Sequence, residues 1–132
     1  MVEFIQSGSV VLAIIVRAQY RREGVEFFTP LSFSQQLGYM NRPKGYVVVP
    51  HKHLPQSREV LNTQEVLFVR SGKIRADFYT ENNDYHSSAL LLPHDVILLA
   101  AGGHGFEMLE DSELIEVKQG PYNEKTDKLH FQ

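Results

Sequence analysis

The sequence contains no cysteine and no tryptophan, and it lacks both a long apolar run and an excess of basic residues. Without cysteine there is no disulfide, no thiolate zinc site and no cysteine nucleophile, so any metal ion must bind to nitrogen and oxygen. The longest apolar run, Val10–Val16, has seven residues, far fewer than the ~20 that span a membrane as a helix. With 13 basic against 16 acidic residues and no basic stripe, we expect neither nucleic acid nor membrane as a partner.

The remaining composition is that of an ordinary globular protein. Hydrophobic residues make up 42% of the chain and charged residues 22%, which is close to the average for folded domains. A length of 132 residues suits one domain and leaves no room for a second. The start, Met1-Val2-Glu3, lacks the positively charged region of a secretory signal, so we expect a cytoplasmic protein.

The apolar pattern predicts an all-β fold, because apolar residues occur in short β-branched runs or in strict alternation. Strands are expected at 10–17, 25–28, 36–41, 45–53, 65–70, 73–79, 96–101 and 114–118. Arg42-Pro43-Lys44 is expected to join two of these strands as a turn, and Ser71-Gly72 to form a tight hairpin. Many short strands predict one jelly-roll barrel, with 1–30 as N-terminal strands and a candidate dimer arm, and 120–132 as a polar surface tail.

His51 and His53 are the most informative pair, since residues two apart on a strand point to the same face. The run Tyr46-Val47-Val48-Val49 favours such a strand, on which two imidazoles can share one ion. Ordinary hydrogen bonding at a strand end is the alternative interpretation.

Two further residues have the side chains and the strand positions of metal ligands. Glu65 shares strand parity with Leu67 and Val69, so its carboxylate is expected to point inward, where it needs a cation or a paired charge. His104 shares parity with Phe106 and follows Gly102-Gly103, where glycine permits a sharp turn and a close approach. A strand-end carboxylate exposed to water and a hydrogen-bonded core histidine are the alternatives.

The spacing of these residues resembles the signatures of the cupin superfamily. Gly45-x5-His51-x-His53 followed by Glu65-x6-Gly72 resembles the first signature, and Asp95 to His104 resembles the second. The resemblance, which is to small single-domain bacterial metal-binding cupins, extends from Gly45 to about Met108, half of the chain. It implies a cupin-like double-stranded β-helix over 1–132, in which 45–108 is the metal-site core.

By the same resemblance, His51, His53, Glu65 and His104 bind one divalent metal ion. Eleven residues separate His53 from Glu65, where the family usually has three or four, so a long loop, 54–64, is expected over the mouth of the site. Glu59 lies nearer to the histidine pair and is the rival carboxylate.

The metal site would suit Mn, Fe, Ni or Zn, between which nitrogen and oxygen ligands do not decide. The function that follows is a metalloenzyme, an oxygenase or isomerase, for a small organic acid or carbohydrate. One alternative is a metal-free sugar or sugar-nucleotide epimerase or isomerase that uses His51 or His53 as general base. The other is a non-catalytic ligand-binding or sensing module.

Candidate contacts to a small-molecule substrate at the barrel mouth are Tyr39, Arg42, Tyr46 and Arg58. On the opposite side of the 65–70 strand, Val66 and Phe68 form an apolar outer face that needs a cover. We therefore expect a homodimer, with Val10–Val16 as a candidate interface strand.

Overall fold

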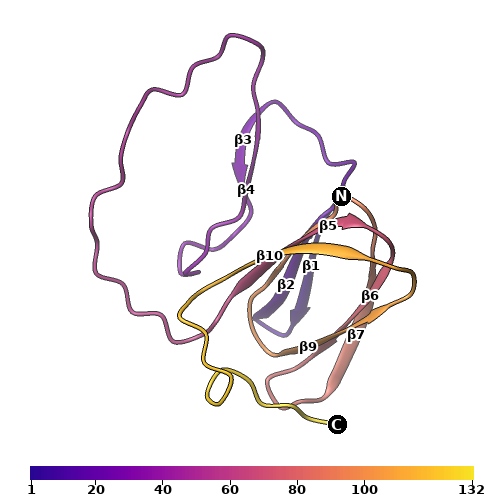
Figure 1. Ribbon diagram of the computed structural model, residues 1–132. Coiled ribbons are helices and arrows are strands. Elements are labelled where there is room, and N and C mark those ends of the chain that lie inside the picture. The colour runs from indigo at the N-terminus through magenta and orange to yellow at the C-terminus, as the bar shows by residue number, and fades with distance from the viewer.

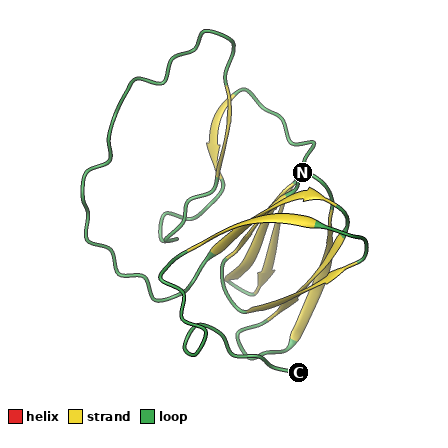
Figure 2. Ribbon diagram, viewed as in Figure 1, coloured by secondary structure: helices red, strands yellow, loops and turns green.

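A computed structural model describes residues 1–132 as ten β-strands with no helix (Figures 1 and 2). The structure therefore contains no helix that is long and apolar enough to cross a membrane. The strands are β1 (Val2–Ser7), β2 (Val10–Val16), β3 (Gly24–Phe27), β4 (Gly38–Asn41), β5 (Glu65–Ser71), β6 (Ile74–Tyr79), β7 (Tyr85–Leu91), β8 (Val96–Leu99), β9 (Gly103–Met108) and β10 (Glu113–Lys118).

The strands form three antiparallel sheets. A large sheet has the order β1-β2-β8-β5-β10, a small sheet has the order β7-β6-β9, and β3 and β4 pair with each other. The large and small sheets share one hydrophobic core and together form a sandwich. The buried residues of this core are Leu12, Ala13, Ile15, Leu67, Val69, Ile74, Ala76, Phe78, Leu91, Ile97 and Leu99. The all-β prediction is confirmed, although the two sheets do not close into a barrel.

The chain passes back and forth between the two sheets after β5. The strands β5, β8 and β10 belong to the large sheet, whereas β6, β7 and β9 belong to the small one. The predicted hairpin at Ser71-Gly72 is therefore wrong, because the chain crosses there from one sheet to the other. Gly72 has φ +95°, and a Cβ atom on it would lie 2.5 Å from the Asp111 carbonyl oxygen. The glycine thus serves a crowded crossing between sheets.

The outer face of the large sheet is apolar across all five strands. Its strand register places two cross-strand rows there, Phe4-Ile14-Leu98-Val66-Val117 and Val2-Val16-Val96-Phe68-Ile115. Ile14 and Leu98 in the middle of the sheet are fully buried, whereas the rows end on exposed residues such as Phe4 and Val117. The outer face predicted from Val66 and Phe68 thus extends from one edge of the sheet to the other.

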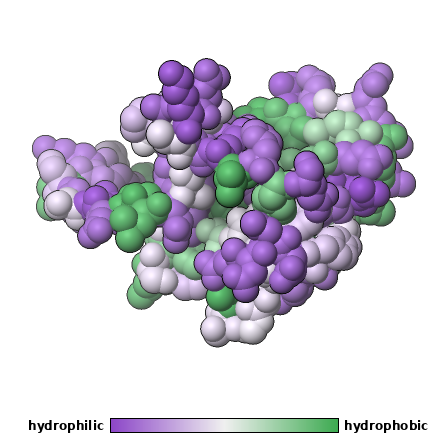
Figure 3. Space-filling view, turned by 90° about the horizontal axis from the view of Figure 1, so that it is seen from below, coloured by the Kyte–Doolittle hydropathy of each residue, from purple (hydrophilic) through white to green (hydrophobic).

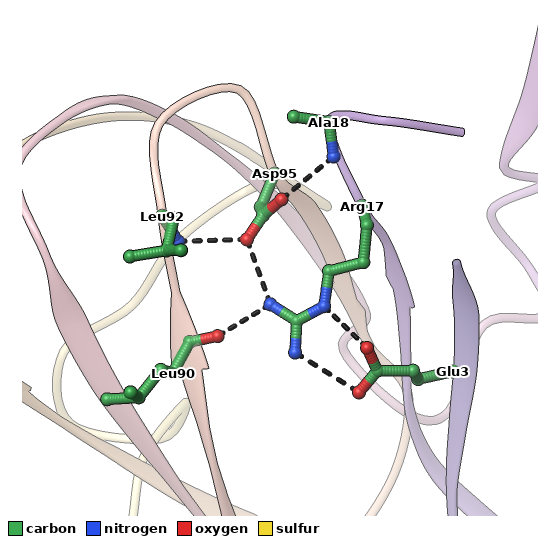
Figure 4. Close-up of polar contacts among 6 residues, drawn as sticks. All are labelled: Glu3, Arg17, Ala18, Leu90, Leu92 and Asp95. Carbon is green, nitrogen blue, oxygen red and sulfur yellow. Dashed lines mark hydrogen bonds and ion pairs between the residues drawn. The ribbon is translucent and has the colours of Figure 1, made fainter. Parts of the chain in front are cut away.

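A buried ion-pair network joins the N-terminal strands to the rest of the large sheet (Figure 4). Asp95, 2% exposed, accepts hydrogen bonds from Arg17 Nη1 at 2.9 Å, from the Ala18 backbone N–H at 2.9 Å and from that of Leu92 at 2.8 Å. Arg17 also donates to both carboxylate oxygens of Glu3. Because each buried charge has a partner, the network stabilises this end of the sandwich.

Residues 42–62, here called the arm, form no regular structure and lie away from the sandwich (Figure 1). The predicted strand over 45–53 is wrong, and β4 pairs with β3 instead. No hydrogen bond or ion pair joins residues 43–62 to the remainder of the chain. The physical reason is that a strand needs a neighbouring strand, and in this conformation none lies beside the arm.

Candidate functional site

Glu65 and His104 meet between the two sheets of the sandwich. Glu65 begins β5 on the inner face of the large sheet, in line with the buried Leu67, and His104 lies opposite the buried Phe78 in the register of β6 and β9. Their side chains are in contact, with His104 Nε2 2.9 Å from Glu65 Oε1. Both side chains thus point toward the space between the sheets, Glu65 mostly buried and His104 still exposed to solvent.

The Glu65 carboxylate is held in its ionised form. Its side chain is 12% exposed, and the hydrogen bond to His104 lowers its pKa to about 2, although burial opposes this. Lys118, directly across from it on β10, places Nζ 3.6 Å from Glu65 Oε2 and 3.0 Å from Glu116 Oε1. The site therefore combines two carboxylates with an ammonium and an imidazole.

An open cavity of about 1020 Å³ surrounds this pair. Its walls include the inner face of β10, through Leu114, Glu116 and Lys118, and the inner face of β9, through Phe106 and Met108. The inner faces of β9 and β10 thus border the same cavity, and β9 is the edge strand of the three-stranded small sheet.

Two segments outside the sheets, the end of the arm and the C-terminal tail, also border the cavity. The end of the arm, Leu61 and Asn62, lies on one side together with Thr63, and the C-terminal tail from Thr126 to Phe131 lies on another. The Phe131 ring packs edge-on against Tyr79, with ring centroids 5.0 Å apart. The tail, predicted as a polar surface segment, thus also contributes an aromatic residue to the cavity wall.

The structure does not bring His51 and His53 to this cavity. Both are exposed on the arm, their ring centroids are 5.4 Å apart, and His51 Nδ1 lies 2.8 Å from the carbonyl oxygen of Val49. The rival carboxylate, Glu59, is likewise exposed on the arm. No group of three or more histidine, aspartate or glutamate side chains lies close enough together to hold a metal ion.

The four candidate substrate contacts lie outside the cavity lining. Arg42, Tyr46 and Arg58 are on the arm, where the Arg42 guanidinium lies over the Tyr46 ring, 4.4 Å from its centroid. Tyr39, on β4, packs edge-on against Tyr20 with ring centroids 5.0 Å apart. Any contact of these side chains with a ligand in the cavity requires the arm and the β3–β4 hairpin to move.

Two residues of the site are not predicted from the sequence. The position of Lys118 has a signal in the sequence, whereas that of Phe131 has none. Lys118 alternates with Glu116 and Leu114 along a strand that was expected from the sequence, and Leu114 is apolar, so the parity alone places Lys118 on the inner face. Phe131 lies in a polar tail without periodicity. Its position against Tyr79 follows from the tertiary fold and has no local signal.

In the pair formed by Glu65 and His104, the carboxylate can orient the imidazole ring. A carboxylate bound to one ring nitrogen fixes the orientation of a histidine and leaves the other nitrogen for a ligand or a proton. The same oxygen and nitrogen atoms are suitable ligands for a divalent transition metal. Comparisons of the chain with models of protein families, with curated proteins and with solved structures give no match.

Proposed function

We propose that this protein is a metal-binding cupin with a metal centre formed around Glu65 and His104. The observation that carries the proposal is their contact at 2.9 Å between two different sheets, since both residues occupy the positions that the cupin resemblance assigns to ligands. Supporting it, the chain alternates between two antiparallel sheets as a jelly roll does.

The donor set fits a divalent ion in kind but falls short in number. Glu65 supplies an oxygen and His104 a nitrogen, and both belong to the ligand types that Mn, Fe, Ni and Zn accept. Catalytic metal sites generally have three protein ligands, so one or two more donors are required. His51 and His53, on the arm, are the residues that would complete the site.

The cavity supports a small molecule as the substrate, either an organic acid or a carbohydrate. Its volume, about 1020 Å³, lies just above the usual size range of small-molecule sites. A divalent ion held there supplies Lewis-acid chemistry. The chain's own residues orient the ligand, with Lys118 available for an anionic group and Phe106 for an apolar surface. A metal-dependent isomerase or oxygenase is the activity class that follows.

Metal content and metal binding test this proposal directly. We expect purified protein to contain close to one equivalent of a divalent transition metal after loading and desalting, and E65Q and H104A to lose it. The matched control is H86A, because His86 is an exposed histidine on β7 whose side chain forms a hydrogen bond only with Ser87. Equal metal content in all four proteins, or none in the wild type at a 100-fold excess of Mn²⁺, Fe²⁺, Ni²⁺ and Zn²⁺, would reject the metal centre.

A metal-free isomerase is the second candidate, and the direct hydrogen bond between Glu65 and His104 favours it. A histidine oriented by a carboxylate is a suitable general base for proton transfer. This alternative places the base at His104, whereas the sequence indicated His51 or His53. Turnover of a sugar or sugar nucleotide that survives exhaustive chelation but is lost in H104A would establish it. Binding without turnover would instead indicate a non-catalytic module.

The homodimer expected from the sequence remains part of the proposal. The exposed ends of the two apolar rows on the outer face of the large sheet, Phe4, Ile115 and Val117, support it, because exposed apolar side chains gathered on one face mark interaction surfaces. A twofold axis brings the same face of two copies together, so the rows would be their own complement.

A further inference from the structure

We propose that the arm of one copy binds to the sandwich of a second copy and supplies His51 and His53 to its cavity. The exchange itself is argued from the fold. The role of the two histidines as ligands rests on the metal centre proposed above.

The receiving surface is the free edge of β9. This strand pairs only with β6, so one row of its backbone N–H and C=O groups lacks a strand partner, which is the usual template for strand addition. The same edge borders the cavity that faces the inner side of β10. A strand added to β9 therefore fills the fourth position of the small sheet and lies beside His104.

The arm carries a segment suited to that edge. Tyr46, Val47, Val48 and Val49 are consecutive residues with high strand propensity, yet they are 50 to 74% exposed. Exposing four such side chains to water costs free energy, and burial against a neighbouring sheet would recover it. Pro50 follows them, and proline is tolerated at the edge of a sheet because its nitrogen has no hydrogen to donate.

Strand alternation gives the two faces of this segment different characters. If His51 and His53 point inward, Val47 and Val49 point inward with them, because all four share the same parity. Tyr46, Val48 and Lys52 then lie on the outer face. The inward set combines two apolar side chains for the cavity wall with two imidazoles for the space near Glu65 and His104.

The position of the arm favours a second copy as the receiver. The arm projects from the sandwich at the left of Figure 1, and the view turned about the horizontal axis shows a projection on the same side (Figure 3). Since no hydrogen bond joins residues 43–62 to the rest of their own chain, the arm in this conformation is free to be covered by another molecule. Its own β9 has no strand on that edge.

Symmetry and size agree with an exchange. Under a twofold axis each copy gives one arm and receives one, so both free edges are covered and the exchange closes within one pair of copies. The outer face of the large sheet is a separate surface, so contact through it would join such pairs. An arm of about 20 residues matches the 20 to 30 residues that each partner contributes to an interface of standard size. Each of the two sites then consists of Glu65 and His104 from one chain and the histidine pair from the other.

Complementation between two inactive variants tests the exchange. The arm variant is H51A/H53A and the cavity variant is E65Q/H104A, and each alone is expected to bind no Mn²⁺ or Zn²⁺. When they are unfolded and refolded together, mixed dimers contain one complete site, so binding should return to about a quarter of the wild-type value per chain. Wild-type binding without any recovery in the mixture would overturn the exchange and leave the metal centre standing.

Cysteine cross-linking tests the exchange without a metal, which keeps it testable if the wild type binds none. The chain has no cysteine of its own, so each introduced pair is the only one. Y46C, V48C and K52C are each combined with E107C, because Glu107 lies on the outer face of β9. Under mild oxidation at least one double variant should form a disulfide-linked dimer.

The products distinguish the outcomes of this second experiment. A monomer with an internal disulfide means that the arm folds back onto its own sandwich, and a reduced monomer for all three pairs means that the arm does not reach β9 at all. Either result would overturn the proposal. The control is L31C/E107C, since Leu31 is 96% exposed and lies outside the arm, so it reports the level of accidental cross-linking.

Discussion

Glu65 of the large sheet and His104 of the small sheet form a direct side-chain contact, with Oε1 and Nε2 2.9 Å apart. The two residues are far apart in sequence, and the contact ties the two layers of the sandwich together at the edge of the cavity. It is therefore both a structural link and the centre of the candidate site.

The first prediction concerns acid stability of the chelated protein. The pKa of Glu65 is about 2 when folded and 4.5 in its ordinary state, so the ionised carboxylate stabilises the fold above pH 4.5 and this contribution is lost as the pH falls toward 2. Its upper limit is about 3 kcal/mol. Urea denaturation in the presence of EDTA should show wild type more stable than E65Q at pH 6 and equal to it near pH 2. A constant difference across this range would contradict the assignment.

The second prediction concerns the buried network around Asp95. In D95N the Arg17 guanidinium loses its buried counter-charge, and the amide N–H₂ group faces N–H donors where an oxygen accepted hydrogen bonds. We expect a loss of about 3 to 5 kcal/mol in the free energy of unfolding. The matched control is E3Q, which removes the other partner of Arg17, a half-exposed one, and should cost less than about 1 kcal/mol. Equal losses in chemical denaturation would show that burial does not set the strength of this network.

The third prediction compares two glycines that both have a positive φ, +60° at Gly8 and +95° at Gly72. Gly8 and Gly72 both have positive φ, but a Cβ on Gly8 meets nothing within 4 Å, whereas on Gly72 it meets Ser112 Oγ at 2.1 Å. G8A should therefore cost only the left-handed backbone conformation, about 1 to 2 kcal/mol. G72A should cost at least about 2 kcal/mol more, because the crossing between sheets must shift. Melting temperatures of the two variants measure the difference, and similar values would argue against a crowded crossing.

The fourth prediction concerns the outer face of the large sheet. V117E places a charge at the end of one apolar row, next to Val66, and should weaken self-association at least tenfold. The chain should remain folded, since Val117 is 58% exposed. Sedimentation or light scattering against concentration, from a 15.1 kDa monomer upward, measures this effect, with L31E as the control outside the rows. Equal association of the two variants would contradict a dimer that uses this face.

Alternation within strands predicted much of the fold and half of the candidate site. The parity of Glu65 with Leu67, and of His104 with Phe106, is a local property, so inward orientation could be derived for both without tertiary information. Two strands of the large sheet follow from continuous apolar runs, Val10–Val16 and 96–101, the second of which the structure ends at Leu99. The strands β1, β7 and β9 are not among those expected from the sequence.

What the sequence could not predict depends on partners distant in the chain. The run 45–53 has strand composition, yet a strand also needs a neighbour, and composition does not name one. For the same reason Ser71-Gly72, typical of a hairpin, serves instead as a crossing between layers. The pairing of β4 with β3, rather than with the arm, likewise depends on which edge is available.

Gln64 gives the arm an attachment that touches the candidate site. The side-chain oxygen of Gln64 accepts hydrogen bonds from the Gln35 backbone N–H at 3.1 Å and from Ser34 Oγ at 3.3 Å. The backbone N–H of Gln64 donates to Gln119 Oε1 at 2.8 Å. Gln64, which holds the chain at the base of the arm, therefore immediately precedes Glu65. In the proposed exchange, a swing of the arm would act through a single peptide unit on Glu65, the first of the proposed ligands, so assembly and ion affinity would be mechanically coupled.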